Sequence, residues 1–491
     1  MKLSKSKFCK GVQCPKILWL DAYKSELAED TANESILRTG NEVGDLAMQY
    51  FGDFEEVAWN ISKQQMVADT QELLTQGERI IAEASFLYND LFCSVDILKR
   101  NEDGTFDIIE VKSSTAINDI YYYDMAFQYH VVSNAGLQVA KVYNMHLNSQ
   151  YVRQGELDLQ ELFVLEDCTE KVLSMQDTVL AELQEMNTYN ATDEEPFMEV
   201  GVHCQAPYFC AYHTYCHRHI PAQSVFDIHG MTAKKKYELY YTGIVDFDDI
   251  IARKPKMSQK QLQQVEAVYY NQKPVILQDK IKEFIDTLTY PLYYLDFETY
   301  QQAVPLYDGV TPYTQIPFQY SLHVQKTKGG SLEHYEFLGK EGEDPRRALA
   351  EQICRDIPMD VCTLAYNMAF EKNVLKNLAQ QYPDLADHLL NIVENIKDLM
   401  IPFQKQHYYC KEMMGSYSIK YVLPALCSDD PELDYHALEG IHNGSEAMSA
   451  YADLVNHTAE EIAVIRKNLL AYCRLDTLAM VKILEKLHEV I

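Results

Sequence analysis

The sequence predicts an α/β protein built from three parts. Short apolar runs typical of buried strands alternate with segments of helical periodicity, for example at 292–297 and 346–356. A chain of 491 residues is also too long for one ordinary core. Between the two α/β regions lies a lysine-rich stretch of helical pattern. We therefore expect an N-terminal domain over 1–225, a helical connector over 226–285 and a C-terminal domain over 286–491.

The N-terminal part begins with helical segments and continues with a β-hairpin. Apolar residues at helical spacing predict a helix over 40–50. An Asp-Gly turn between the apolar runs 91–98 and 106–112 predicts the hairpin. A helical pattern at 121–133 and a strand pattern at 139–147 follow. In the connector, 258–270 has helical periodicity.

The C-terminal part contains strands first and interleaved helices afterwards. A short apolar run at 292–297 predicts a buried strand, and alternation at 318–326 predicts a second. The later elements are a helix at 346–356, a strand at 361–366, a helix at 371–380 and a long closing helix at 459–490. This order predicts an α/β core.

Composition indicates a cytoplasmic globular protein. Hydrophobic residues make up 47% and charged residues 24% of the chain. No apolar run approaches the roughly 20 residues that cross a bilayer, and the basic N-terminus lacks the apolar segment of a signal peptide. We expect no membrane association. The twelve cysteines are then expected to be thiols or metal ligands, because disulfides rarely persist in the cytoplasm.

The formal net charge of −30 weighs against a broad basic surface for nucleic acid. Net charge governs solubility and long-range steering, however, and does not describe a single site. A nuclease that binds phosphates through carboxylate-held divalent metals can be acidic overall. Local basic stretches occur at 234–236 and 253–260, where a solvated helix face is the alternative explanation.

Acidic residues near both ends of the C-terminal part predict a metal site. Asp296 and Glu298 are two apart at the end of an apolar strand, so their side chains share one face. Tyr472 and Asp476 are four apart in the closing helix and also share a face. Glu371, where a predicted strand gives way to a helix, supplies a further carboxylate. Carboxylates that hold two divalent metals are the usual device for phosphodiester hydrolysis, although an acidic pair at a strand end is also common on plain surfaces.

This pattern resembles the RNase H-like 3′–5′ exonucleases with four acidic residues and a tyrosine (DEDDy type). The resemblance covers about residues 290–491. Asp296 and Glu298 match the first motif, and Tyr472 and Asp476 match the third. In the middle motif Asn367 and Phe370 match, while Glu371 stands where aspartate is usual. The resemblance implies an RNase H-like domain in which Mg2+ or Mn2+ is held by Asp296, Glu298, Glu371 and Asp476, with Tyr472 positioning the water.

The segment 415–420 resembles the Ser-Tyr segment that these exonucleases carry between motifs two and three. Two explanations are open. Ser416 or Ser418 caps a helix, or Lys420 contacts the substrate. Asp398 is another candidate acidic ligand.

The predicted hairpin of the N-terminal part carries a second acidic group. Glu110 and Lys112 share one face of a strand and can meet Asp96 across the hairpin. Two carboxylates can hold a metal, while a lysine can orient water or stabilise developing charge. Gln128 follows in the next helix, within reach of the same group. A cross-strand salt bridge is the alternative.

With its cysteines, this part resembles the RecB/AddB-like nucleases of the PD-(D/E)XK superfamily, including iron–sulfur exonucleases. The resemblance covers about residues 1–225 and implies a restriction-endonuclease-like fold. It implies catalysis by Asp96, Glu110, Lys112 and Gln128, with metal on Asp96 and Glu110. It also implies a four-iron four-sulfur cluster on Cys14, Cys204, Cys210 and Cys216. Cys9 is a substitute for Cys14. Zinc is the rival cofactor, because His203, His213, His217 and His219 crowd the same segment.

One departure concerns the upstream helix, where these nucleases carry a histidine ligand. The comparable segment here, 40–45, has none, and Glu42 or Asp45 would have to substitute. The two parts together look like a bacterial family, known as a domain of unknown function, fused to a RecB-like nuclease.

The sequence thus predicts a metal-dependent nuclease with two centres, acting on DNA rather than RNA and mainly from strand ends. The alternative is a nucleic-acid-binding or scaffold protein with an iron–sulfur cluster and reduced catalysis. An iron–sulfur redox sensor is a third hypothesis. The sequence names no protein partner in DNA repair or defence.

Overall fold

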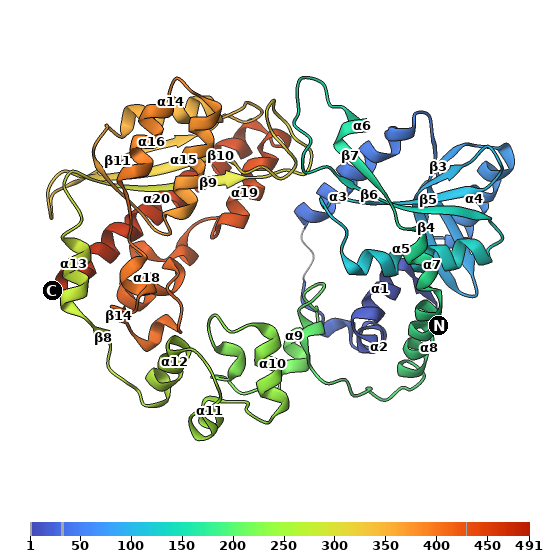
Figure 1. Ribbon diagram of the computed structural model, residues 1–491, viewed down its shortest axis with the longest axis horizontal. Helices are drawn as coiled ribbons and strands as arrows, with labels where there is room; N and C mark the ends of the chain where they lie inside the picture. The colour runs from blue at the N-terminus through green and yellow to red at the C-terminus, as the bar shows by residue number, and fades with distance from the viewer. Residues whose placement is uncertain (1, 31–33, 429) are drawn as a thin grey trace. The chain divides into compact units, whose positions relative to one another are not determined.

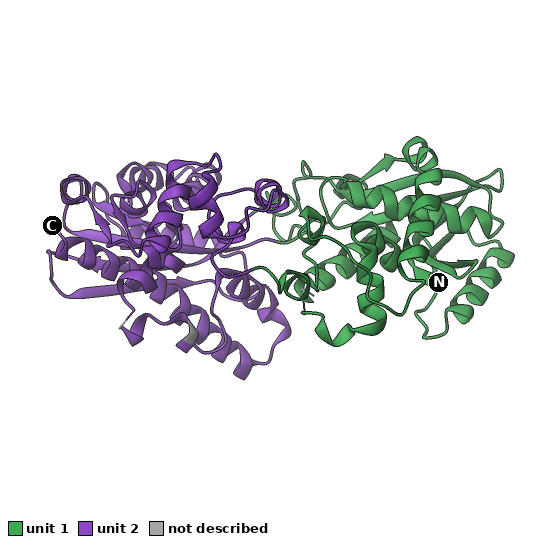
Figure 2. Cartoon of the chain, turned by 90° about the horizontal axis from the view of Figure 1, so that it is seen from below, with its two compact units in different colours: residues 1–220, 302–314 green, residues 221–301, 315–491 purple. Residues whose placement is uncertain are grey.

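The computed structural model describes residues 2–30, 34–428 and 430–491 and has a mixed α/β architecture (Figure 1). The chain forms two compact units (Figure 2). Unit 1 comprises Met1–Ile220 and Gln302–Thr314, and unit 2 comprises Pro221–Gln301 and Gln315–Ile491. The expected connector 226–285 therefore belongs to unit 2. Residues 302–314, placed by sequence in the C-terminal domain, belong to unit 1.

Unit 1 is built on a seven-stranded mixed sheet with the order β2-β3-β4-β5-β6-β7, in which β1 pairs with β4. Strands β3, β4 and β5 form an antiparallel meander, and the predicted hairpin is its second half. β6 is parallel to β5, and helix α5 connects the two. The strands are β1 Leu3–Ser4, β2 Glu55–Glu56, β3 Ile80–Tyr88, β4 Leu91–Arg100, β5 Phe106–Lys112, β6 Val139–Leu147 and β7 Phe163–Asp167.

Helices cover both faces of this sheet. Ile108 packs in one apolar cluster with α1, α5, α7 and α8, whereas its neighbour Ile109 packs in another with α3. Because neighbouring strand residues face opposite ways, Glu110 and Lys112 lie on the α5 side. The helices are α1 Lys5–Gln13, α2 Pro15–Tyr23, α3 Glu34–Met48, α4 Lys63–Gln76, α5 Asp119–Asn134, α6 Leu159–Leu162, α7 Thr169–Ser174, α8 Gln176–Tyr189 and α9 His213–His217.

Unit 2 is built on a five-stranded sheet with the order β11-β10-β9-β12-β13. β9, β10 and β11 form an antiparallel meander, and β12 and β13 continue the sheet in parallel with β9. The strands are β9 Leu292–Tyr300, β10 Ile316–Gln325, β11 Leu332–Leu338, β12 Cys362–Ala365 and β13 Ile396–Asp398. A separate pair joins β8 Val275–Ile276 to β14 Tyr408–Tyr409.

Two helical layers enclose this second sheet. Leu295 and Phe297 pack against α14, α15 and α16, whereas Leu292 and Tyr294 pack with α20 and α18. The helices are α10 Ala233–Tyr241, α11 Phe247–Arg253, α12 Gln259–Tyr269, α13 Gln278–Ile285, α14 Arg346–Asp356, α15 Ala369–Gln381, α16 Ala386–Asn395, α17 Ile401–Gln404, α18 Ile419–Leu426, α19 Gly444–Asp453 and α20 Ala459–Glu489. The expected long closing helix is α20.

In the described part of the chain, no helix is both long and apolar enough to cross a bilayer. All twelve cysteines are described, and none forms a disulfide.

Candidate active sites

The carboxylates of unit 2 lie where β9 meets α20. Asp296 and Glu298 have the same parity as Tyr294, so both project toward the α20 side of the sheet. On α20, Tyr472 and Asp476 are one turn apart. One carboxylate oxygen each from Asp296, Glu298 and Asp476 lie within 4.8 Å of one another. Strand and helix thus bring together residues that are far apart in sequence.

These carboxylates raise one another's proton affinity. Burial, and then the charge of Asp476, raise the pKa of Glu298 to about 8. The pKa of Asp296 is raised well above its usual value by burial and by the neighbouring carboxylates. Burial also raises the pKa of Asp476, to about 6. Three acidic groups gathered without a counter-charge are costly unless a cation joins them. All the donors are oxygens, which Mg2+ and Mn2+ prefer, so the group fits a divalent cation.

Glu371 lies beside this group but outside the 4.8 Å set. Its side chain is buried in the first turn of α15, and its charge acts on both Asp296 and Glu298. Oε2 of Glu371 has no hydrogen-bond partner among the described residues. Burial raises its pKa to about 8. An unpartnered buried oxygen on a residue whose charge acts on Asp296 and Glu298 suits a fourth ligand position.

Asp398 has a backbone role. Its Oδ1 accepts hydrogen bonds from the amides of Asn367 (3.0 Å) and Met400 (2.9 Å). Asn367, two residues after β12, has a φ of +68°. Asp398 therefore holds the sharp turn that leads into α15 and so helps to position Glu371.

The structure adds two residues that the sequence patterns did not indicate. The hydroxyl of Tyr435 donates a hydrogen bond to Oδ1 of Asp476 at 2.6 Å. Sγ of Cys473 lies 3.7 Å from Oδ2 of Asp296. Tyr435 sits in a short turn without periodicity, so only its distance in space from Asp476 reveals it. Cys473 is fully buried and contacts a candidate ligand.

Lys420 is the basic residue whose charge acts on this group of carboxylates. Its charge lowers the pKa values of both Glu298 and Asp476. Lys420 and Tyr435 also line a cavity of about 690 Å³ with Leu423, Pro424 and His442. Gly444, at the start of α19, lies against the acidic group: a Cβ there would lie 3.6 Å from Oε2 of Glu298. The predicted capping by Ser418 is only partly seen, because Ser418 is the N-cap of α18 but its side chain makes no capping hydrogen bond.

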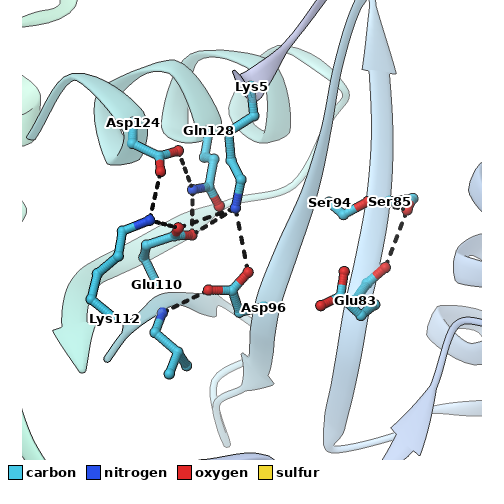
Figure 3. Close-up of polar contacts among 10 residues, drawn as sticks. Lys5, Glu83, Ser85, Ser94, Asp96, Glu110, Lys112, Asp124 and Gln128 are labelled. Atoms are coloured by element: carbon cyan, nitrogen blue, oxygen red, sulfur yellow. Dashed lines mark hydrogen bonds and ion pairs between the residues drawn. The ribbon is translucent and has the colours of Figure 1, made fainter. Parts of the chain in front are cut away.

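In unit 1 the expected residues also converge (Figure 3). Nζ of Lys112 lies 2.5 Å from Oε1 of Glu110 and 2.9 Å from Oδ2 of Asp124. Nε2 of Gln128 donates to Oε2 of Glu110 at 2.6 Å and to Asp124 at 3.0 Å. Oδ2 of Asp96 accepts from the amide of Val111 at 2.7 Å. Glu110, Lys112 and Gln128 therefore form one hydrogen-bonded group with Asp124 across β5 and α5, and Asp96 of β4 is fixed beside it by the Val111 amide.

Lys5 is the residue that sequence reasoning missed at this site. Its ammonium lies 3.3 Å from Oδ1 of Asp96, and 3.1 and 3.0 Å from the two oxygens of Glu110 (Figure 3). Burial opposes its charge, but the carboxylates raise the pKa of Lys5 well above its usual value. Burial likewise opposes ionisation of Glu110, yet Lys112 and Lys5 hold its pKa well below the usual range. No motif or spacing in the sequence connects Lys5 with the residues of the hairpin.

Glu83 is a fourth carboxylate near this group, after Asp96, Glu110 and Asp124. It lies in β3 with a φ of +55°, a left-handed conformation that costs a non-glycine residue energy. Burial, and then the charge of Asp96, raise the pKa of Glu83 to about 7. With Lys5, Asp96 and Glu110 it lines a cleft of about 900 Å³, to which Asp45 of α3 also contributes. Asp45, rather than Glu42, thus lies on the cleft where a histidine was expected.

The four expected cysteines line one small cavity of unit 1, together with His203 and Tyr212. Backbone amides point at two of the sulfurs: Gly201 N lies 3.5 Å from Sγ of Cys204, and Tyr212 N lies 3.4 Å from Sγ of Cys210. The Tyr212 amide favours the thiolate of Cys210, but burial outweighs it and raises the pKa of this thiol to about 11. The cavity joins α2, which follows Cys14, to the segment that carries Cys204, Cys210 and Cys216.

The spacing of these sulfurs bears on the choice of metal. Tetrahedral zinc with thiolate bonds of about 2.3 Å would place its sulfurs about 3.8 Å apart. Among the described residues, the one set of three or more metal-ligand atoms within 4.8 Å of one another is that of Asp296, Glu298 and Asp476. No three of the four cysteine sulfurs therefore lie within 4.8 Å of one another.

Comparison with known proteins gives one family match. A model described as a domain of unknown function (DUF2779) matches residues 293–418. The match covers Asp296, Glu298 and Glu371 but ends before Tyr472 and Asp476. A search of curated proteins returns no match for this chain.

Proposed function

We propose that this protein is a metal-dependent nuclease and that unit 2 removes nucleotides from the 3′ end of a strand. The observation that carries the proposal is the gathering of one carboxylate oxygen each from Asp296, Glu298 and Asp476 within 4.8 Å, from a strand and a helix. This oxygen-only group suits divalent metals that act on phosphodiesters. DNA is the preferred substrate class in this proposal, and RNA is the alternative.

An RNase H-like fold for unit 2 is part of the proposal. The strand order β11-β10-β9-β12-β13, with an antiparallel first half and a parallel second half, supports it. The first acidic pair lies on the central strand, and Tyr472 and Asp476 lie on the last helix, in agreement with the motif order of the DEDDy exonucleases. For unit 1 we propose a restriction-endonuclease-like fold, which the hairpin β4–β5 followed by α5 supports.

The residues of unit 2 have distinct roles in this mechanism. Asp296, Glu298, Asp476 and Glu371 would hold Mg2+ or Mn2+, which polarises the phosphoryl oxygen and lowers the pKa of the attacking water. Burial and Asp476 raise the pKa of Tyr472, so its hydroxyl keeps its proton and orients water by donating a hydrogen bond. Tyr435 fixes the orientation of Asp476. Lys420 supplies positive charge on the side where a phosphate would enter.

The test is digestion of 3′- and 5′-labelled DNA and RNA strands by the full-length protein in Mg2+ and in Mn2+. We expect release of nucleotides from the 3′ end. Asp296→Asn and Asp476→Asn should each lower the rate by about a hundredfold or more. Asp248→Asn, an exposed residue of α11, is the matched control and should leave the rate unchanged. Strands that stay intact with both metals would refute the proposal.

For unit 1 we propose a PD-(D/E)XK-type centre of Asp96, Glu110, Lys112 and Gln128, with a four-iron four-sulfur cluster on Cys14, Cys204, Cys210 and Cys216. The shared cavity, the N–H donors to sulfur and the wide sulfur spacing support the cluster over zinc. Held there, the cluster would join α2 to the segment after residue 200.

A second candidate is a nucleic-acid-binding protein with reduced catalysis. The ion pairs of Lys5 at Asp96 and Glu110 favour this for unit 1. Binding of a labelled strand that persists in Asp296→Asn, without turnover in the native protein, would support this candidate.

A further inference from the structure

The backbone around Lys5 is fixed from two sides. β1, directly before it, pairs in parallel with β4 through Leu3↔Leu91 and Ser4↔Phe92. On α1, directly after it, Phe8 is fully buried and stacks on Phe127 of α5 at 4.6 Å. β4 carries Asp96, and α5 carries Gln128. The start of α1 is thus held against the two elements that form the acidic group, and Lys5 points into it (Figure 3).

The Lys5 ammonium bridges the two carboxylates that the sequence predicts as metal ligands. It lies 3.3 Å from Oδ1 of Asp96 and 3.0 Å from Oε2 of Glu110. Each oxygen of Glu110 then has two donors: Lys5 and Lys112 at Oε1, and Lys5 and Gln128 at Oε2. A cation that binds Glu110 would have to displace at least one of these donors.

The two acidic groups of the protein differ in this respect. Among the described residues, no ion pair involves Asp296, Glu298 or Asp476, and their oxygens lie close enough for one cation. The carboxylates of unit 1, in the same described ranges, form no such set. Instead, Asp96, Glu110 and Asp124 are paired with Lys5 and Lys112. Among the described residues, the unit 2 carboxylates have no ion-pair partner within 4.0 Å and feel Lys420 only from farther away, whereas unit 1 supplies its own paired cations.

We infer that the Lys5 ammonium occupies the place of the divalent cation in unit 1, so that this site is metal-free at rest and binds Mg2+ or Mn2+ only when Lys5 is displaced. The electrostatic reason is that a cation must compete with a fixed positive charge about 3 Å from both carboxylates. This inference does not depend on the activity proposed for unit 2. It makes Lys5 a positioning residue that sets the metal affinity of unit 1.

The test measures Mn2+ binding by electron paramagnetic resonance of free Mn2+. Every sample is full-length protein with Asp296→Asn and Asp476→Asn, so that unit 2 does not contribute. This background should bind no Mn2+ at concentrations that saturate the native unit 2 site. Adding Lys5→Met should create one site with affinity higher by at least about tenfold. Lys5→Arg keeps the charge and should stay weak, and Lys7→Met, exposed on the same helix, should match the background.

Two results would overturn the inference. One is a Lys5→Met protein that folds, by circular dichroism, but binds Mn2+ no more tightly than the background. The other is tight Mn2+ binding by the background itself that Glu110→Gln removes. The second result needs no Lys5 variant, so it decides the question even where Lys5→Met does not fold. Failure of nucleotide release by unit 2 would leave both measurements unaffected.

Discussion

Neutralising one carboxylate of unit 2 should stabilise the metal-free protein. Oxygens of Asp296, Glu298 and Asp476 lie within 4.8 Å of one another. At an effective dielectric constant of about 20, one such pair of ionised groups costs about 3.5 kcal/mol. For a unit of this size, about 2 °C of unfolding midpoint corresponds to 1 kcal/mol. At pH 9, above the pKa values of about 8 for Glu298 and about 6 for Asp476, Asp296→Asn should therefore raise the midpoint by up to about 7 °C.

The stability of the metal-free protein should also depend on pH. The folded pKa of Glu298 is raised to about 8 from a usual value of 4.5, so the folded state holds a proton that the unfolded chain releases. The contribution of Glu298 to the stability of the metal-free protein should be fully present below pH 4.5 and should be lost as the pH rises through about 8. In Asp296→Asn the fall should be smaller.

Differential scanning calorimetry of the full-length protein between pH 5 and 9 measures both effects. Added Mg2+ should raise the midpoint of the native protein at pH 9, because it binds the folded state alone, but should leave Asp296→Asn nearly unchanged. Asp248→Asn is the control, with an expected change within about 1 °C. A lower midpoint for Asp296→Asn at pH 9, or a native midpoint insensitive to pH, would refute the reasoning.

Three further predictions concern other parts of the chain. Tyr435→Phe removes the hydroxyl that lowers the pKa of Asp476, so the acid limb of the pH–rate profile should move to higher pH; an unchanged profile would contradict that role. Gly415→Ala should lower the free energy of unfolding in urea by about 2 kcal/mol or more, because φ is +76° and the new Cβ would meet Oε1 of Gln264 at 2.4 Å. Gly329→Ala is the control: its φ is +69° but its Cβ would face open space, so it should cost less. Cys204→Ser should abolish absorption near about 400 nm in anaerobically purified protein, whereas the control Cys427→Ser should keep it. A colourless native protein that contains zinc would disprove the cluster.

Local patterns predicted many elements closely. The strand expected at 139–147 is β6, and the helix expected at 346–356 is α14, with the same bounds. The two-residue period of strands and the 3.6-residue period of helices depend only on residues close in sequence. They can therefore be recognised without knowledge of the fold. β3 and β11 were not among the predicted elements.

Strand β10 shows what alternation leaves open. The alternation at 318–326 predicted a strand, and in the structure all ten residues of β10 are buried, including its polar ones. Gln319 donates to the carbonyl of Leu469 at 2.8 Å, and His323 contacts Thr477 at 2.8 Å, both on α20. Alternation separates two faces of a strand, but only the tertiary structure shows that a helix, rather than water, satisfies the polar one.

The sequence by itself determined the α/β class, the strand and helix that carry the unit 2 carboxylates, and the hairpin that carries Glu110 and Lys112. Those features follow from short-range periodicity and from residue spacing along one element. Tertiary structure alone decided that Tyr435 binds Asp476, that residues 302–314 belong to unit 1 and that Lys5 pairs with Asp96 and Glu110. Lys5 is 91 and 105 residues away from those partners. Contacts over such separations depend on how sheets and helices pack, which no local pattern encodes.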